Sequence, residues 1–210
     1  MWCSMGDPPL EVDELVVIAR EHMAVEPIAL YVHGSRAYGY SHPGSDYDIR
    51  GVFVERDPEV YLSPTSVVRS DARLEEPPFD IHLWEIRKFV RLLLKYNPIV
   101  YELLCINPVY VSPTFREDYE RLLASSRRLL TLYPLSMLYN HYHGMFRSWM
   151  RYLRKGVKKA VLHVLRCFLA MAYICRMLAP PPITMDAVSY THLRAHETEA
   201  DLVCRLLLEK

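Results

Sequence analysis

The hydrophobic period of the chain changes near residue 83, and this change limits the folds open to it. Before that point, short apolar runs rich in β-formers are separated by loops marked with Gly and Pro, at 28–34, 47–55, 67–69 and 79–83. Beyond it, apolar residues recur at helical spacing, in the segments 84–96, 99–105, 114–130, 134–155 and 157–178. A first helix is also predicted over 10–23, and a Thr114-x-x-Glu117 capping box opens the 114–130 helix. The sequence therefore predicts an α/β (α+β) region over 1–83, with a small mixed sheet and flanking helices, followed by a helical region over 84–187.

Composition excludes several broad classes of protein. The 210 residues carry 25 Lys and Arg against 25 Asp and Glu, which excludes a strongly basic coat over the whole chain and an acidic tail. The most apolar run, Cys167–Cys175, has nine residues and is too short to span a bilayer. The first residues lack the features of a signal peptide, and the five cysteines form no CxxC pair. We expect a cytoplasmic protein with reduced thiols and no membrane association.

The segment 188–210 is set apart from the rest of the chain. Its sequence, VSYTHLRAHETEADLVCRLLLEK, resembles the translation of a transposon-library sequencing adapter. It follows a proline-rich helix stop without a linker, and we exclude it from fold reasoning as a non-native tail. The natural chain is expected to continue beyond Ala187.

The glycines point to the region where chemistry is expected. Four of the seven glycines, Gly34, Gly39, Gly44 and Gly51, fall within eighteen residues, and glycine concentrates where the backbone turns tightly or approaches a ligand. Ten residues after Gly34-Ser35 comes the sequence Asp46-Tyr47-Asp48-Ile49.

Two carboxylates in this sequence are predicted to share a face. In a strand, side chains two residues apart point the same way, so Asp46 and Asp48 lie together and repel each other unless a cation lies between them. Oxygen ligands of this kind suit Mg²⁺ or Mn²⁺.

Asp80 is the candidate for a third carboxylate. It lies in the apolar run FDIHL, where a lone charge on a strand needs a partner or a metal ion. Asp71, Glu75 and Glu76 are nearby alternatives, but the glutamates precede two prolines and are assigned to a loop. An isolated Asp-x-Asp is more often a solvated turn, so the metal-site hypothesis depends on Gly34-Ser35 and Asp80 together.

These residues resemble a known family. The sequence GSRAYGYSHPGSDYDIRGVFV (34–54), with a later strand aspartate, is similar to the nucleotidyltransferases of the DNA polymerase β superfamily and to their branch associated with RNA repair. The string KKAVLHVLR (158–166) also resembles that branch, and the resemblance covers about 28–178. It implies a sheet of the nucleotidyltransferase type followed by a helical substrate-side region.

The resemblance also implies roles for the residues. Gly34, Ser35 and Arg36 would bind the phosphates of an NTP, and Asp46, Asp48 and Asp80 would hold two Mg²⁺ or Mn²⁺ ions. Asp80 would also take the proton of the attacking hydroxyl. The implied reaction transfers a nucleoside monophosphate to an acceptor hydroxyl, such as an RNA end. The alternatives are nucleotidylation of a protein or small molecule, and a toxin–antitoxin type of binding partner without turnover.

Three residues of the rear half have two interpretations. Lys159, His163 and Arg166 recur at i, i+4 and i+7 on one helix face. Their spacing alone favours a solvated basic face. The family resemblance favours contacts with a nucleotide or a nucleic-acid acceptor.

Overall fold

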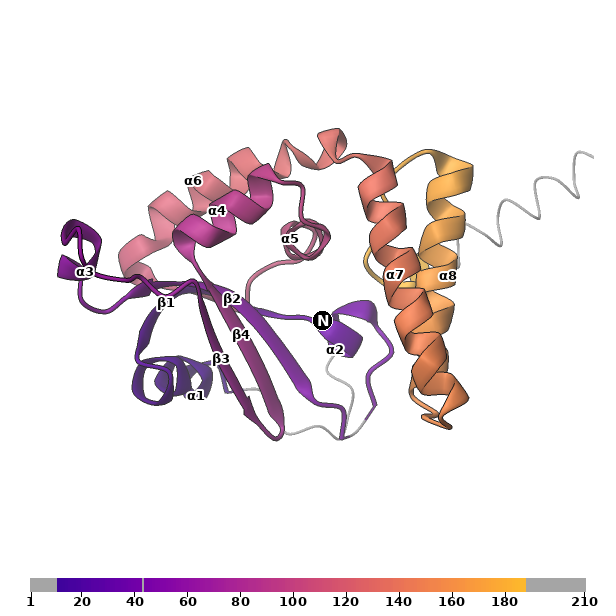
Figure 1. Cartoon of the computed structure of the whole chain (residues 1–210), viewed down its shortest axis with the longest axis horizontal. Coiled ribbons are helices and arrows are strands. Elements are labelled where there is room, and N and C mark those ends of the chain that lie inside the picture. The colour runs from indigo at the N-terminus through magenta and orange to yellow at the C-terminus, as the bar shows by residue number, and fades with distance from the viewer. Residues whose placement is uncertain (1–10, 43, 188–210) are drawn as a thin grey trace, which may run out of the picture. The chain divides into compact units, whose positions relative to one another are not determined.

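The computed structural model describes residues 11–42 and 44–187 and contains a five-stranded sheet with helices on both faces (Figure 1). The elements from the start of the described chain to residue 85 are α1 (Val12–Val17), the π-helical turn η1 (Ile18–His22), β1 (Val25–Val32), α2 (Gly34–Tyr38), β2 (Tyr47–Glu55), α3 (Glu59–Leu62), β3 (Asp71–Glu76) and β4 (Phe79–Glu85). The later elements are α4 (Ile86–Leu94), α5 (Pro98–Leu104), β5 (Tyr110–Val111), η2 (Pro113–Phe115), α6 (Arg116–Arg127), η3 (Leu130–Leu132), α7 (Leu135–Arg154) and α8 (Ala160–Met177).

The sheet is mixed, with the strand order β3-β4-β2-β1-β5. The central pair β2 and β4 is parallel, and the other pairs are antiparallel. This arrangement confirms the α/β class with a small mixed sheet and flanking helices.

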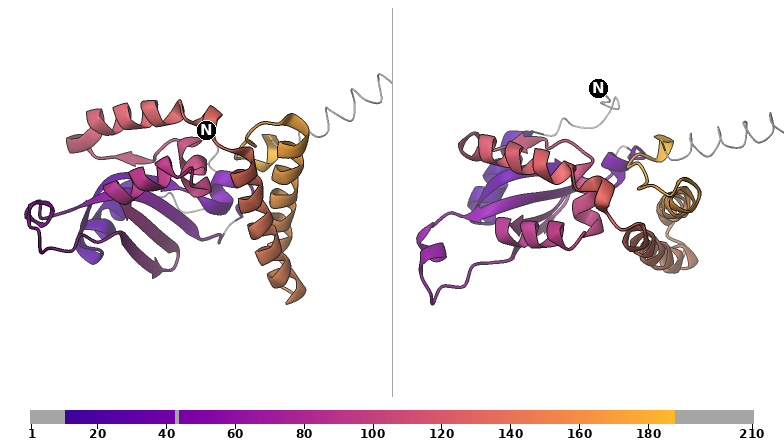
Figure 2. Two further views of the ribbon diagram at one scale, coloured as in Figure 1. Left: turned by 45° about the horizontal axis from the view of Figure 1, so that its top comes forward. Right: turned by 90° about the horizontal axis from the view of Figure 1, so that it is seen from above.

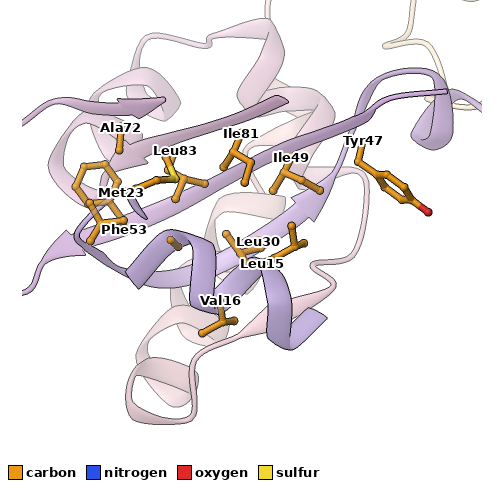
Figure 3. Packing of buried hydrophobic residues seen from close by; sticks show 12 residues of the cluster. Leu15, Val16, Met23, Leu30, Tyr47, Ile49, Phe53, Ala72, Ile81 and Leu83 are labelled. Carbon is orange, nitrogen blue, oxygen red and sulfur yellow. The ribbon is translucent and has the colours of Figure 1, made fainter. Parts of the chain in front are cut away.

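Alternation along the strands separates two cores. One face buries Ile49, Phe53 and Ile81 under α1, as Figure 3 shows for this cluster. The opposite face buries Val52 and Trp84 under helices α4, α5 and α6, which cover the sheet from the other side (Figure 1). Because side chains alternate along a strand, the even-numbered residues of β2 and β4 face the α4–α6 side.

The boundary between compact units lies later than the sequence pattern indicated. Described residues up to Leu132 form one unit, and those from Tyr133 form a second. Helices α4, α5 and α6 fall after residue 83 but belong to the first unit, because their apolar stripes pack on the sheet. The helical stripe from residue 84 onward therefore does not mark a separate domain by itself.

Some predicted elements differ from the observed ones. The segment 67–69 is not a strand; Val67 is 90% exposed, and the strand begins at Asp71 instead. The predicted capping box is also wrong: α6 begins at Arg116 after a 3₁₀ turn, and its N-cap residue, Phe115, makes no side-chain cap bond. The cap of α5 is clear, since the Asn97 side chain accepts from the N–H groups of Ile99 and Val100.

The second unit is built on two long antiparallel helices. Helices α7 and α8 lie side by side in both views of Figure 2, in orange and yellow. Helix α8 extends the apolar Cys167–Cys175 run to 18 residues with a mean hydropathy of 1.5, so it is long and apolar enough to cross a membrane. A third of it is buried within the structure, and core helices of soluble proteins also meet this criterion.

Candidate functional site

The site lies at the end of the sheet where β1 finishes and the parallel strands β2 and β4 begin. Asp48 and Asp80 are direct register partners on β2 and β4. Both face the α4–α6 side of the sheet, because their neighbours Ile49 and Ile81 lie in the opposite core. The structure thus places side by side two carboxylates that are 32 positions apart in the sequence.

Arg50 lies between these carboxylates. Its Nη2 is 3.0 Å from Oδ2 of Asp80 and 3.6 Å from Oδ1 of Asp48, and its Nη1 donates to the main-chain oxygen of Asp80. Burial raises the pKa of Asp48, and the nearby Asp80 raises it further, while Arg50 acts in the opposite direction. The sequence analysis assigned Arg50 no role, although its position two residues after Asp48 places it on the same strand face.

Gly34 is packed directly against Asp48. Its φ is +63°, and a Cβ at this position would overlap Oδ2 of Asp48. The preceding residue, His33, donates its N–H to the main-chain oxygen of Asp48 at 2.7 Å. Only glycine meets both requirements, a left-handed backbone and the absence of a side chain. The Gly34-Ser35 turn and the carboxylate therefore form a single local structure.

A buried polar network holds this turn in place. Oε2 of Glu102, on α5, is 2.8 Å from Nε2 of His33 and accepts from the Tyr38 hydroxyl at 2.9 Å. Glu102 is 1% exposed, His33 8% and Tyr38 3%. A buried carboxylate requires such partners. The sequence analysis missed Glu102; the signal was a single carboxylate in the apolar helix PIVYELL.

The remaining residues assigned to the front half are arranged differently. Asp46 is exposed and lies before β2, whose first residue is Tyr47, so strand alternation does not orient Asp46 as predicted. Ser35 is half-buried in the first turn of α2. Arg36 donates to the main-chain oxygen of Ser45 at 2.7 Å, and its guanidinium lies 3.7 Å from the centre of the Tyr47 ring. Through these contacts Arg36 links α2 to Ser45 and to Tyr47 at the start of β2.

The donor set suits a hard divalent cation but is not a complete triad. Asp48 and Asp80 offer adjacent carboxylate oxygens, and burial together with the neighbouring Asp80 raises the pKa of Asp48, an effect that a bound cation would oppose. Within 11–42 and 44–187, no three His, Cys, Asp or Glu side chains are gathered to hold a metal ion. The two strand aspartates fit such an ion, and Glu75, the register partner of Asp80 on β3, is a further carboxylate on the same face of the sheet.

The three residues from the rear half do not form a solvated basic face. Arg166 is 2% exposed, and its guanidinium lies 5.3 Å from the centre of the Tyr142 ring. His163 stacks on Trp149 with the ring centres 3.9 Å apart, and burial lowers the pKa of His163 to about 4. Lys159 is exposed and precedes the first residue of α8.

Comparison with known proteins identifies the family. The RNA repair pathway DNA polymerase beta family matches residues 11–209, and the chain belongs to this family. The matched range includes most of the 188–210 segment, which lies outside the described residues and which the sequence analysis set aside as foreign. The match therefore does not separate that segment from the rest of the chain.

The relatives in this comparison carry no assigned function. The chain is 30% identical over 205 residues to the uncharacterized protein YcgL of Bacillus subtilis (strain 168), covering 95% of this chain and 74% of YcgL. It is 26% identical over 148 residues to the uncharacterized protein MJ0002 of Methanocaldococcus jannaschii, covering 68% of this chain and 57% of MJ0002.

Among solved structures, a nucleotidyltransferase-like protein from Exiguobacterium sibiricum 255-15 is similar at a TM-score of 0.32 and 15% identity. The alignment covers 81% of this chain and 60% of that one. A TM-score of 0.32 is too low to establish a shared fold. Family membership and the mixed α/β sheet define a nucleotidyltransferase-like protein.

Proposed function

We propose that the protein transfers a nucleoside monophosphate from an NTP to an acceptor hydroxyl, in the repair of RNA. The observation that supports this proposal is the register pairing of Asp48 with Asp80, with the Gly34 backbone packed against the Asp48 carboxylate. Polar groups from three elements are thereby held at one end of the sheet. Family membership supports the same reaction class.

Each group has a role in this proposal. Backbone N–H groups of Gly34 and Ser35, in the first turn of α2, would donate to the NTP phosphates. Asp48 and Asp80, with Asp46, would hold Mg²⁺ or Mn²⁺. When bound, such ions supply positive charge for the α-phosphate and for the departing pyrophosphate.

The proposed transfer replaces one phosphorus–oxygen bond with another, and the electrons of the broken bond leave with the pyrophosphate. The acceptor oxygen forms a bond to the α-phosphorus as the bond from that phosphorus to the bridging oxygen of the β-phosphate breaks. The carboxylate of Asp80, 45% exposed, takes the hydroxyl proton. Arg50, which donates to Asp80, holds that carboxylate in position.

The test measures transfer of label from each of four α-labelled NTPs. The acceptors are single-stranded RNA, an unfolded protein and the chain itself, each with and without Mg²⁺ or Mn²⁺. We expect metal-dependent transfer to RNA and release of pyrophosphate. Asp48→Asn should lower this transfer at least about a hundredfold, since each ~1.4 kcal/mol of lost transition-state stabilisation is tenfold.

Asp57→Asn is the matched control. Asp57 is exposed and lies just beyond the end of β2 that is opposite to Asp48, and its Oδ1 accepts from the N–H of Glu59, which an asparagine oxygen can also do. Transfer should be unchanged in this variant. Robust transfer that survives Asp48→Asn would show that the site is wrong, and transfer to protein alone would refute the RNA acceptor.

A further inference from the structure

Charge in this neutral chain is unevenly distributed. Residues 133–187 carry eight Lys and Arg against a single acidic residue, Asp186, for a formal charge of +7. Residues 1–132 carry 14 basic against 20 acidic residues. A helical unit with this excess of positive charge attracts polyanions. The excess is not visible in the net charge of the whole chain, because the acidic first part balances it.

Three arginines are aligned along α7. Arg147, Arg151 and Arg154 are exposed and follow each other at i, i+4 and i+7, so they share one helix face over about 10 Å. Among the residues that the structure describes, none of the three forms an ion pair. This arginine face, as we call Arg147, Arg151 and Arg154, is therefore a row of uncompensated charge.

The arginine face borders hollows in the surface. One hollow of about 500 Å³ is lined by the three arginines together with Gly144, Phe146 and Met150. A Cβ at Gly144 would meet no atom within 4 Å, so the hollow is open at that point. A second hollow, of about 430 Å³, continues past Arg151 and Arg154 to Tyr152 and Lys155.

The chemistry of this surface suits a chain of phosphates. Arginine binds phosphate oxygens in a bidentate manner, and three arginines spaced over about 10 Å match several phosphates in a row better than one small anion. Tyr152 is 49% exposed beside Arg151, and an exposed ring next to a basic groove offers a base a stacking surface.

An anionic membrane is the weaker explanation. A helix that lies on a membrane carries its apolar and basic side chains along the same helix. Here more of the exposed large apolar side chains of the unit lie on α8, including Phe168 at 55% and Met177 at 52%, than on α7, which carries the arginine face.

We propose that the arginine face of α7 binds the phosphodiester backbone of a single-stranded nucleic acid, with Tyr152 stacking on a base. This binding surface goes beyond the proposed transfer reaction and does not depend on it. Binding requires neither an NTP nor the carboxylates of β2 and β4.

The experiment measures binding of the full-length protein to fluorescent single-stranded RNA and DNA of the same sequence, about 15 nucleotides long, by anisotropy. Neither NTP nor divalent cation is present. The test variant is Arg147→Gln/Arg151→Gln/Arg154→Gln, with α7 and α8 monitored by circular dichroism. We expect its affinity to fall at least about thirtyfold at low salt. The slope of log K against log[salt] should fall by about 2, since each phosphate contact to a single strand contributes about 0.7.

Two further variants distinguish a defined surface from general charge. Arg91→Gln/Lys95→Gln/Arg128→Gln removes the same charge from exposed positions of the first unit and should leave affinity and slope unchanged. Tyr152→Leu should weaken binding about fivefold or more, as loss of one stacked base does, with the salt slope kept.

Three outcomes would overturn the inference. They are unchanged affinity in the triple arginine variant, an equal loss in the control triple variant, and wild-type binding to phosphatidylserine vesicles without binding to either oligonucleotide. Since binding is measured without NTP, a protein that binds but does not transfer label counts only against the proposed function.

Discussion

The α-carbon of Gly34 lies against the carboxylate of Asp48, so that even a methyl group at Gly34 would overlap Oδ2. These two residues come from different elements, α2 and β2, and their contact joins the turn after β1 to the strand that carries the aspartate. The distance between the turn and the carboxylate is therefore set by glycine itself.

Gly34→Ala should destabilise the protein by at least about 2 kcal/mol, because it adds a steric overlap to an unfavourable positive φ. Gly39→Ala is the matched control, since Gly39 has φ +82° but open space around its Cβ position. It should cost about 1 kcal/mol, the price of the left-handed backbone alone. Urea unfolding measures both. Equal losses would contradict the steric role of Gly34.

Asp48→Asn should change the pH dependence of stability. The pKa of Asp48 is raised in the folded state, so the folded protein keeps this proton to higher pH than the unfolded chain. The contribution of Asp48 to stability should therefore fall as pH rises from 3.8, the ordinary value, through the raised pKa. The Asn variant lacks this loss and should be the more stable protein at neutral pH in EDTA.

Excess Mg²⁺ should reverse that order, because a cation held by carboxylates stabilises only the folded state. The measurement is thermal unfolding of both proteins across pH, with and without the metal ion. A wild type that is more stable than Asp48→Asn in EDTA at neutral pH would mean that the carboxylate serves the fold and not a ligand.

Glu102→Gln should cost about 1–3 kcal/mol, because it removes the charge that accepts from Tyr38 and faces His33 in a buried site. Glu120→Gln is a suitable control: Glu120 is 58% exposed in a surface pair, where the effect should stay below about 0.5 kcal/mol. Transfer should also fall in Glu102→Gln, since the network holds the Gly34 turn. Unaltered stability in this variant would rule out the network as a support.

His163→Phe should make the protein less sensitive to acid. Burial, with Arg166 and Lys159 nearby, lowers the pKa of His163 to about 4, against 6.5 in the unfolded chain. The folded state thus binds fewer protons, and stability should be lost as pH falls from 6.5 toward 4. Phenylalanine keeps a ring beside Trp149 without the titration. The imidazole pKa, measured by NMR, tests whether His163 is the source of this acid sensitivity. A value near 6.5 would exclude His163 as the source.

The sequence pattern was sufficient for the central strands and the long helices. The predicted run 47–55 is β2 itself, and 134–155 differs from α7 by one residue at each end. These segments bury a full face, so hydrophobic periodicity reports them directly. The edge strand β3 was missed because Arg73, Glu75 and Glu76 are charged, as exposed edges commonly are.

The site was only partly accessible from the sequence. Alternation along a strand placed Asp48, and apolar neighbours singled out Asp80, so both face the same side of the sheet. The positions of Arg50 and Glu102 could not be read in this way, because they depend on which strands pair and on where α5 packs. The orientation of Asp46 could not be predicted from alternation, because Asp46 lies one residue before β2 and side chains alternate only within a strand.

The parallel pairing of β2 with β4 also affects what the chain can tolerate between them. The 56–70 segment leaves β2 at Glu55, contains α3, and returns through the β3–β4 hairpin. The register of β4 against β2 is held by the sheet itself, and Leu62 and Val67 in the segment are 84% and 90% exposed. The length of the 56–70 segment therefore does not affect the distance between Asp48 and Asp80. A homologue could accept an insertion of many residues here, even a small folded module, without moving either carboxylate.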